Sequence, residues 1–265
     1  MPSINENISV SVVIPCFNSR KTIFRAIRSV LNQSVKVKEI ILVDDFSSDG
    51  SQEYIANLIQ KLNDKRIRLI CLKENSGPGC ARNIGWDNST GDWIAFLDAD
   101  DSWNKSKIEI QYNWANSKSN VDLCSHASII YKARQFDSKK DFSFRKISYY
   151  RMLFSNQIET RTVMLRRKIP IRFKDRNFTE DYLLWLEIIY LGYSAYKLKT
   201  YLSYTYRDEF SSGGYSGNLW QHEKKELNAF IYLYKTNKLS FGYFIFFFVL
   251  SFLKFLIRFC KRNLK

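Results

Sequence analysis

Residues 93–103 read Trp-Ile-Ala-Phe-Leu-Asp-Ala-Asp-Asp-Ser-Trp, and the rest of the chain is organised around this stretch. Its first five residues form a short apolar run, which is typical of a strand buried on both faces of a parallel sheet. The run stops on three carboxylates, Asp98, Asp100 and Asp101. Because ligands of open α/β sheets bind just beyond the carboxyl ends of the strands, these acids are expected at a binding edge.

Asp98 and Asp100 lie two residues apart, so on an extended backbone their side chains point to the same side. Two neighbouring carboxylates suit a hard divalent cation that keeps waters and substrate phosphates as its other ligands. The alternative is a solvated acidic turn that caps the next helix, which is the commoner role of a single Asp-x-Asp motif. The rest of the chain has to decide between the two.

Three more apolar runs precede this strand, and segments of helical periodicity separate them. The expected strands are residues 11–14, 39–43, 67–72 and 93–97, and the expected helices lie within 23–31, 55–62 and 80–86. This alternation predicts an α/β fold with a mainly parallel central sheet flanked by helices. The second strand also ends on acids, Asp44 and Asp45, which this topology brings to the same edge as the first three.

The composition indicates a folded, basic protein. Its 265 residues are 45% hydrophobic and 16% aromatic, and the net charge is +15 with a pI near 9.5. Such an excess of cations suits nucleic acid, an anionic membrane surface or a phosphorylated ligand. The five cysteines are scattered, and with only two histidines they argue against a zinc site and for reduced thiols. Without a signal-peptide pattern at the N-terminus, we expect a cytoplasmic protein.

The second half has less regular patterns. Strands are expected at 123–131 and 162–166, an extended segment at 195–206, and helices at 182–191 and 216–235. No linker rich in Pro, Gly or Ser separates the halves. We therefore expect one domain over residues 1–238, with a nucleotide-binding half at 1–115 and an acceptor half at 116–238.

Residues 239–265 differ from the rest of the chain. The thirteen residues 241–253 carry no charge and include six phenylalanines. A polar and basic stripe follows at spacings of three and four: Ser251, Lys254, Arg258, Lys261, Arg262 and Lys265. This pattern predicts an amphipathic C-terminal helix on the anionic inner face of the cell membrane. The alternative is a C-terminal helix packed on the core, with its cations favoured by the helix dipole.

Four motifs in a fixed order carry a resemblance to a known family. Residues 11–18 read SVVIPCFN, 43–50 VDDFSSDG, 81–85 ARNIG and 96–101 FLDADD. Together they resemble a family-two inverting glycosyltransferase with the GT-A fold, of the type that builds bacterial surface polysaccharides. The resemblance covers residues 9–103 and resumes weakly at 179–185 and 206–214. It implies transfer of a sugar from a nucleotide-diphosphate donor, a UDP-sugar, to a hydroxyl of a saccharide or lipid-linked acceptor.

The resemblance implies a nucleotide site at the first two strand ends. Pro15, Phe17 and Asn18 match the platform for base and ribose, although the family often has Tyr at the position of Phe17. Asp45 matches the carboxylate that accepts hydrogen bonds from the base. The ordinary structural alternatives are a core aromatic for Phe17 and a turn acid bonded to its own backbone for Asp45.

The resemblance also implies how the diphosphate is held. Arg82 lies just inside a helix start, where a guanidinium and free N–H groups bind anions, whereas its ordinary role would be a surface salt bridge. Asp100 is expected to bind Mn²⁺ or Mg²⁺ directly, and Asp98 to bind the ribose or the metal. Asp101 is expected to assist the Asp98–Asp100 pair or to cap the helix that follows. Such a metal would act as a Lewis acid on the departing oxygen.

Inverting transfer also requires a base that takes the proton of the acceptor hydroxyl. Asp181, in the sequence Thr179-Glu-Asp-Tyr, matches the family's Glu-Asp motif and is the candidate catalytic residue. The alternative is a helix start capped by Thr179, in which first-turn acids only stabilise the dipole. Arg207 with residues 211–214 matches a segment that closes over the diphosphate.

Three other functions compete with the glycosyltransferase hypothesis. A phosphatase or phosphomutase would use Asp98 as a nucleophile, but its acid pair commonly follows the first strand and not the fourth. A nucleotidyltransferase would need a glycine-rich basic loop after the first strand, which this sequence lacks. A nucleic-acid-binding protein would explain the net charge but not the acids at strand ends.

Overall fold

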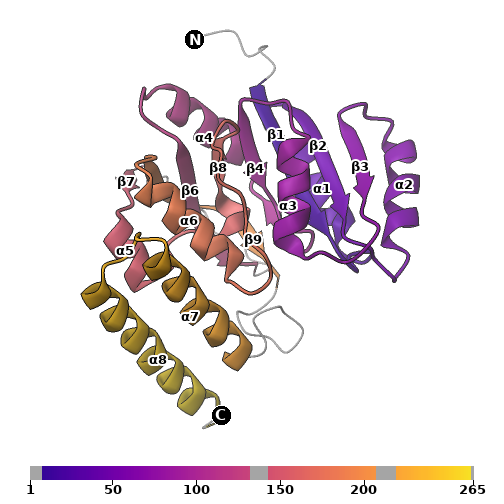
Figure 1. The fold of residues 1–265 in the computed structure, drawn as a ribbon. Coiled ribbons are helices and arrows are strands. Elements are labelled where there is room, and N and C mark those ends of the chain that lie inside the picture. Colours follow the sequence, from indigo (N-terminus) through magenta and orange to yellow (C-terminus); the bar gives the residue numbers. More distant parts are fainter. Residues whose placement is uncertain (1–7, 132–142, 207–218, 264–265) are drawn as a thin grey trace.

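One mixed sheet of nine strands organises the part of the chain that the computed structural model describes, residues 8–131, 143–206 and 219–263 (Figure 1). The strands are β1 (Ile8–Cys16), β2 (Val37–Asp44), β3 (Ile67–Cys71), β4 (Trp93–Phe96), β5 (Ser102–Trp103), β6 (Leu123–Ile130), β7 (Phe144–Lys146), β8 (Met164–Arg166) and β9 (Ala195–Thr205). The helices are α1 (Ile23–Leu31), α2 (Ser51–Leu62), α3 (Pro78–Asp87), α4 (Lys107–Asn116), α5 (Tyr149–Phe154), α6 (Glu180–Tyr190), α7 (Leu219–Lys235) and α8 (Phe241–Asn263), with a 3-10 turn η1 at Thr160–Thr162. The order across the sheet is β3-β2-β1-β4-β8-β6-β9-β5, with β7 paired to β9.

The four strands of the first half are parallel, as the sequence predicts. β1 pairs with β2 on one side and with β4 on the other, and β3 pairs with β2. In this register Cys16 lies beside Asp44, and Val13 lies beside Phe96. The acids that follow β2 and β4 therefore reach the same edge of the sheet, on either side of the end of β1.

Alternating side chains of β1 build cores on both faces of the sheet. Val12 packs with Ile27 of α1 on one face, and Val13 packs with Trp86 of α3 on the other. α3 comes very close to the sheet, because a Cβ added at Gly85 would lie 2.3 Å from Cγ1 of Val13. Only glycine fits this position without a shift of the strand or the helix.

The second half joins the sheet through an antiparallel strand that the βαβ pattern does not foretell. β8 pairs antiparallel with β4 on one side and with β6 on the other, while β6 and β9 are parallel. The sheet is thus mixed and mostly parallel, and it runs without a break from the first half into the second. α6 covers the joint and contributes Leu184, Trp185 and Ile188 to the second core.

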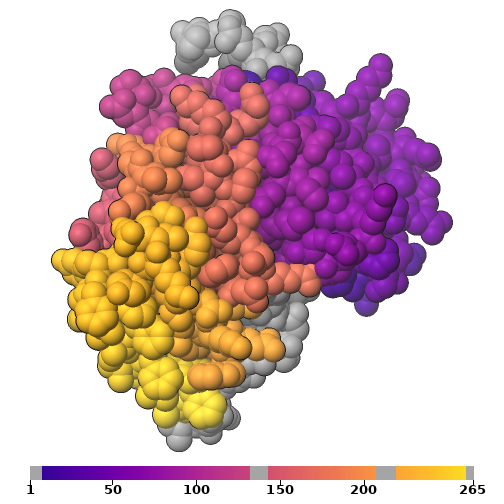
Figure 2. Space-filling view, viewed as in Figure 1, coloured from indigo at the N-terminus to yellow at the C-terminus, as the bar shows by residue number. Residues whose placement is uncertain are grey.

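α8 lies on α7 at the surface (Figures 1 and 2). Three polar side chains of its stripe contact the protein. Ser251 is buried and its hydroxyl donates to Oε1 of Glu223 on α7 at 3.0 Å. Arg258 Nη2 lies 3.0 Å from Oε2 of the same carboxylate, and Lys254 donates to the carbonyl of Phe154. A buried carboxylate requires hydrogen-bonding and charged partners. The side of α8 that carries Ser251 and Arg258 therefore packs against Glu223.

The contacts of α8 bear on both interpretations of this helix. Ser251, Lys254 and Arg258 of the stripe contact the protein, as in the alternative of a packed helix, while the position of α8 on a membrane stays a prediction. Phe247 and Phe255 of α8 are buried, but ten of its large apolar side chains are exposed: Phe241, Tyr243, Ile245, Phe246, Val249, Phe252, Leu253, Leu256, Ile257 and Phe259. Among the described residues, Phe241–Cys260 is the one helix whose length and composition would allow it to cross a membrane.

Candidate active site

The loop after β4 separates two accessible carboxylates from a buried one. Asp98 and Asp100 are half-buried, whereas Asp101 is 1% exposed. Asp101 Oδ2 accepts a bond from Nη1 of Arg161 at 3.1 Å. Burial raises the pKa of Asp101 to about 7, with a further increase from the charges of Asp98 and Asp100 that Arg161 only partly offsets. Asp98 and Asp100 are therefore the members of this trio that a ligand can reach.

Arg82 connects the two halves of the molecule at this loop. Its Nη2 lies 2.7 Å from Oδ1 of Asp98, and its Nη1 lies 3.8 Å from Oε1 of Glu180 at the start of α6. Arg82 is buried, so the alternative of a surface salt bridge is wrong. Burial alone would lower its pKa, but the charges of Asp98 and Glu180 outweigh burial and raise it. One guanidinium thus brings the Asp-x-Asp loop and the Glu-Asp motif together.

Asp181 begins α6 beside this ion pair. Its Oδ1 accepts the backbone N–H of Tyr182 at 2.7 Å, and its Oδ2 accepts the hydroxyl of Thr160 at 3.3 Å. The side chain of Thr179 makes no capping bond, and its buried hydroxyl has no hydrogen-bond partner among the described residues. The alternative of a helix start capped by the Thr179 side chain is therefore wrong, while the catalytic role of Asp181 stays a prediction.

The ends of β1 and β2 present two exposed aromatic side chains. Phe17 is 51% exposed, so it is not the core aromatic of the alternative interpretation. Phe46 is 58% exposed and has φ +61°, a left-handed conformation that is unusual for a bulky residue. Asn18, with φ +47°, accepts the backbone N–H of Ser48 at 2.9 Å and so ties the two loops together. Pro15 lies in β1 beside Val43.

Asp45 is buried at the same edge. Its two carboxylate oxygens accept the backbone N–H groups of Ser76 and Gly77, both at 2.7 Å. These bonds hold the loop that leads into α3, the helix that carries Arg82. Asp45 therefore fixes the position of the loop before α3, and its contact with a base stays a prediction.

Sequence reasoning missed several residues that complete the site. Arg25 donates to the carbonyl of Asp100 at 2.5 Å, and its guanidinium lies 3.5 Å from the ring centroid of Tyr206. Arg161 bonds Asp101, and exposed Phe46 follows the end of β2 as Phe17 follows the end of β1. A Phe within an otherwise small and polar loop was a usable signal for Phe46. Arg25 and Arg161 come from an amphipathic helix and a 3-10 turn that carry no motif. Arg207 and residues 211–214 lie outside the described residues.

The residues after β4 fit a divalent cation that arrives with a diphosphate. The described residues contain no group of three or more His, Cys, Asp or Glu that could hold a metal alone. Asp98 and Asp100 supply two accessible carboxylates, and Mg²⁺-like ions are commonly held by one or two carboxylates plus substrate phosphates and waters. Among the described residues, this donor set suits an ion that shares its ligands with substrate phosphates.

A comparison with protein families settles the class. The family model described as "Glycosyl transferase family 2" matches residues 11–175. The chain belongs to this family. As a member of Glycosyl transferase family 2 it is a glycosyltransferase with a GT-A fold, and neither the phosphatase, the nucleotidyltransferase nor the nucleic-acid-binding alternative is supported.

Similar proteins agree with this assignment. The Escherichia coli protein WfaP, named UDP-Glc:alpha-D-GlcNAc-diphosphoundecaprenol beta-1,3-glucosyltransferase, is 33% identical over 199 residues, which cover 70% of this chain and 72% of that protein. The S. aureus TarS 1-349 structure with UDP-GlcNAc has a TM-score of 0.64 at 20% identity and covers 84% of this chain and 66% of its own. The mannosyltransferase PcManGT from Pyrobaculum calidifontis, in complex with GDP-Man and Mn²⁺, has a TM-score of 0.63 at 16% identity and covers 89% and 66%. At these identities the two structures show that the fold is shared.

Proposed function

We propose that this family-2 enzyme is an inverting glycosyltransferase of bacterial surface polysaccharide assembly. It moves a sugar from a nucleotide-diphosphate donor, a UDP-sugar, to a hydroxyl of a saccharide or lipid-linked acceptor. The observation that carries the proposal is the contact of Arg82 with both Asp98 and Glu180, 2.7 and 3.8 Å away. It puts the donor-side carboxylates and the candidate base around one centre. The UDP-sugar and lipid-linked substrate in the name of WfaP support the substrate classes.

The nucleoside half of the donor would lie at the ends of β1 and β2. Exposed Phe17 offers a flat apolar surface for a base, beside Pro15 and Asn18, and Asp45 holds the adjoining loop in place. The diphosphate would lie towards Arg82 and Arg207. Asp100, assisted by Asp98, would hold Mn²⁺ or Mg²⁺, which when bound supplies Lewis-acid neutralisation of the leaving diphosphate.

Asp181 is the proposed general base. Inversion requires one displacement, in which the acceptor hydroxyl attacks the anomeric carbon opposite the leaving diphosphate and gives up its proton. Asp181 is half-buried, and its bonds to the Tyr182 N–H and the Thr160 hydroxyl fix its orientation. A positioned carboxylate of this kind contributes roughly 10²–10⁴-fold to rate.

Two substitutions test the division of roles. Asp181→Asn keeps the shape of the side chain but removes the proton acceptor, so UDP binding with Mn²⁺ should persist while sugar transfer falls by about 10²-fold or more. Asp100→Ala should instead abolish the Mn²⁺-dependent part of UDP binding. Calorimetry with UDP measures the effect on binding. A screen of nucleotide-sugars for donor hydrolysis measures the effect on turnover. Asp64→Asn, which alters a surface ion pair with Arg66, serves as the control. Equal and mild effects of the first two substitutions would contradict the role assignment.

The exposed apolar face of α8 supports a peripheral position on the inner face of the cell membrane. Its outward side chains include Phe246, Leu253 and Ile257, each at least 50% exposed. Large contiguous apolar patches on an otherwise soluble surface mark interaction sites, and an interfacial helix buries such a face among lipid headgroups. The net charge of +15 favours an anionic bilayer.

Vesicle flotation tests the membrane position. The wild-type chain should float with vesicles that contain anionic lipid, and the triple substitution Phe246→Ser, Leu253→Ser, Ile257→Ser should leave it in the soluble fraction. The triple substitution Ile130→Ser, Leu191→Ser, Phe24→Ser changes exposed apolar side chains elsewhere and should have no effect on flotation. Flotation of the α8 variant at the wild-type level would contradict this position.

A further inference from the structure

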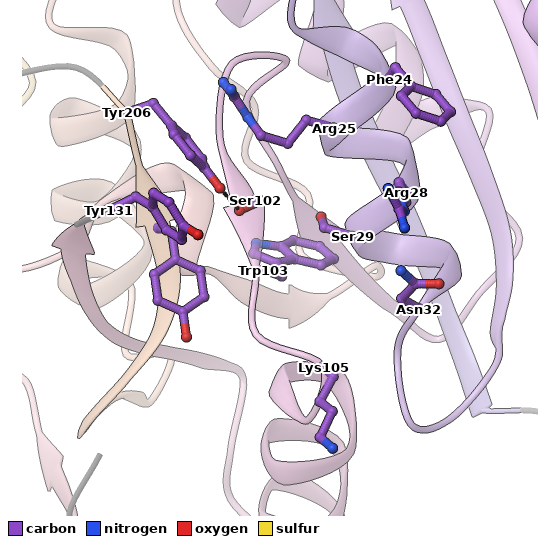
Figure 3. A pocket seen from close by; sticks show the side chains of 11 residues that line it. Phe24, Arg25, Arg28, Ser29, Asn32, Ser102, Trp103, Lys105, Tyr131 and Tyr206 are labelled. Carbon is purple, nitrogen blue, oxygen red and sulfur yellow. Dashed lines mark hydrogen bonds between the residues drawn. The ribbon is translucent and has the colours of Figure 1, made fainter. Parts of the chain in front are cut away.

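A cavity of about 400 Å³ lies between α1 and the β5–β9 pair (Figure 3). We call it the α1 groove, and these residues line it: Phe24, Arg25, Arg28, Ser29, Asn32, Ser102, Trp103, Lys105, Tyr131, Tyr204 and Tyr206. Its volume is in the range of small-molecule pockets, roughly 300–1,000 Å³. None of the residues assigned above to the donor nucleotide, the metal or the base lines it.

The α1 groove adjoins the reaction centre. Ser102 follows Asp101 directly in the chain, and the hydroxyl of Ser102 lies 3.0 Å from that of Tyr206. Arg25 lines the groove and donates to the carbonyl of Asp100 at 2.5 Å. A ligand in the groove would therefore lie beside the loop that carries Asp98 and Asp100.

The charge of the groove is positive. Its lining contains Arg25, Arg28 and Lys105 and no carboxylate. In the described part of the chain, the side chains of Arg28 and Lys105 form no ion pair and no hydrogen bond, and both residues are exposed. Two exposed cations at the rim of one cavity, with no carboxylate partner among the described residues, suit an anionic group such as a phosphate.

The opposite wall of the groove is aromatic, and its rings contact one another. Tyr131 and Tyr206 stack with centroids 4.9 Å apart, and Tyr131 meets Tyr204 edge-on at 5.9 Å. The floor is Trp103, whose indole N–H donates to the carbonyl of Arg161 at 2.8 Å. Figure 3 shows Tyr131 and Tyr206 facing α1 across Trp103. The edges of these rings offer apolar surface to the C–H groups of a sugar ring, and their hydroxyls offer polar contacts.

The arrangement of these rings favours a saccharide over a nucleobase. The ring of Tyr206 is already covered by the Arg25 guanidinium at 3.5 Å and by the ring of Tyr131, so it has no open stacking face. What the groove offers instead are ring edges, tyrosine hydroxyls, and the small polar side chains of Ser29 and Asn32. These groups pair with sugar hydroxyls.

We infer that the α1 groove binds a phosphorylated saccharide as part of the acceptor. The sugar would pack against Tyr131, Tyr204 and Trp103, and its phosphate would lie between Arg28 and Lys105. This inference rests on the proposed function, because it makes the ligand the acceptor of the same transfer.

Calorimetry on the full chain tests binding, with glucose 1-phosphate as the probe. Wild-type protein should bind it more tightly than either glucose or inorganic phosphate, since each of these supplies only half of the contacts. Arg28→Met with Lys105→Met should weaken binding of glucose 1-phosphate by about tenfold or more. Lys65→Met with Lys118→Met makes the same change of net charge at exposed sites outside the groove and should leave the affinity unchanged. Equal affinities of the two double variants would overturn the inference, and so would a probe that binds no better than phosphate.

Competition separates the groove from the donor site and identifies the source of the phosphate. Saturating UDP with Mn²⁺ should not displace glucose 1-phosphate, and displacement would place the phosphate at the donor edge and overturn the inference. A glucosyl diphosphate on a short prenyl chain should displace it, as expected for a lipid-linked acceptor, and failure to compete would overturn the acceptor role. If the protein binds glucose 1-phosphate but not UDP, the proposed function is contradicted, whereas binding of a phosphorylated sugar in the α1 groove is supported.

Discussion

The two halves of the sheet reach the same reaction centre by different routes. In the first half, the candidate site residues directly follow the parallel strands β1, β2 and β4 in the chain. Since these strands end at one edge of the sheet, the residues also lie at that edge. In the second half, the candidate base sits at a helix start and reaches the centre through the contact between Glu180 and Arg82. Site residues that follow strands can be predicted from sequence. The position of the candidate base in the second half depends instead on contacts between residues that are far apart in the chain.

The strongest test of this contrast removes the contact between the halves. Arg82→Met leaves Asp98 and Glu180 without their shared buried partner, and breaking a buried pair in this way costs about 3–5 kcal/mol. Urea unfolding should show this loss, and sugar transfer should fall with it. Arg66→Met, which breaks a surface pair with Asp64, should cost less than about 1 kcal/mol. Similar costs for the two variants would mean that Arg82 does not connect the halves.

The next test compares the close packing of α3 on the first half of the sheet with the open surface of α8, through one glycine in each helix. Gly85→Ala puts a Cβ 2.3 Å from Cγ1 of Val13 and should destabilise the protein by about 1–3 kcal/mol through overpacking. Gly242→Ala in α8 meets nothing within 4 Å and should be neutral or stabilise the helix by up to about 1 kcal/mol. Thermal unfolding measures both. Val13→Ala combined with Gly85→Ala should recover part of the loss, and strictly additive losses would argue against this close contact.

A buried lysine at the junction of the halves makes stability depend on pH. Burial lowers the pKa of Lys107 to about 7, with its Nζ 3.8 Å from the ring centroid of Trp103. Between pH of about 7 and 10.5 the folded chain therefore holds fewer protons than the unfolded chain. The free energy of unfolding should rise with pH across this window, by at most about 1.4 kcal/mol per pH unit.

Lys107→Met should remove this contribution to the slope, and Lys118→Met at an exposed site should keep it. Urea unfolding of the three proteins at several pH values between 7 and 9 measures the slopes. A slope that is the same in the wild type and in Lys107→Met would show that Lys107 stays charged in the folded protein.

The smallest effect concerns the orientation of α8. Ser251→Ala removes the buried hydrogen bond to Glu223 and should cost about 1 kcal/mol, because the carboxylate loses a partner. Val249→Thr on the outward face should change stability by less than about 0.5 kcal/mol. Unfolding in detergent-free buffer compares them. A larger cost at Val249 than at Ser251 would mean that α8 is turned the other way in solution.

Much of the first half could be predicted from sequence for a physical reason. Buried parallel strands are continuous apolar runs, and the acids at 44–45 and 98–101 interrupt them at the point where the strands leave the core. The common edge of these acids follows from the parallel strands that βαβ units produce, because the carboxyl ends of such strands lie at one edge. The contact of Arg82 with Glu180 does not follow, since the two residues are almost a hundred positions apart and belong to different patterns.

Two features of the second half were beyond sequence reasoning. β8 has only three residues, Met164–Arg166, which is too short for its period to show which strands it joins. In α8, periodicity identified the stripe of Ser251, Lys254 and Arg258 but not the side on which its partner lies. Glu223, buried on α7, decides that side, and a glutamate in an otherwise polar segment looks like any surface acid.

The position of β8 between β4 and β6 also constrains how the chain is made. During synthesis β4 leaves the ribosome long before Met164, so its outer edge has no hydrogen-bonding neighbour while the intervening segment is translated. An unpaired apolar edge is a template for wrong pairing with other chains. The nascent N-terminal half therefore exposes the unpaired edge of β4 until β8 has been synthesised. A fragment that ends near residue 115 would keep this edge unpaired permanently.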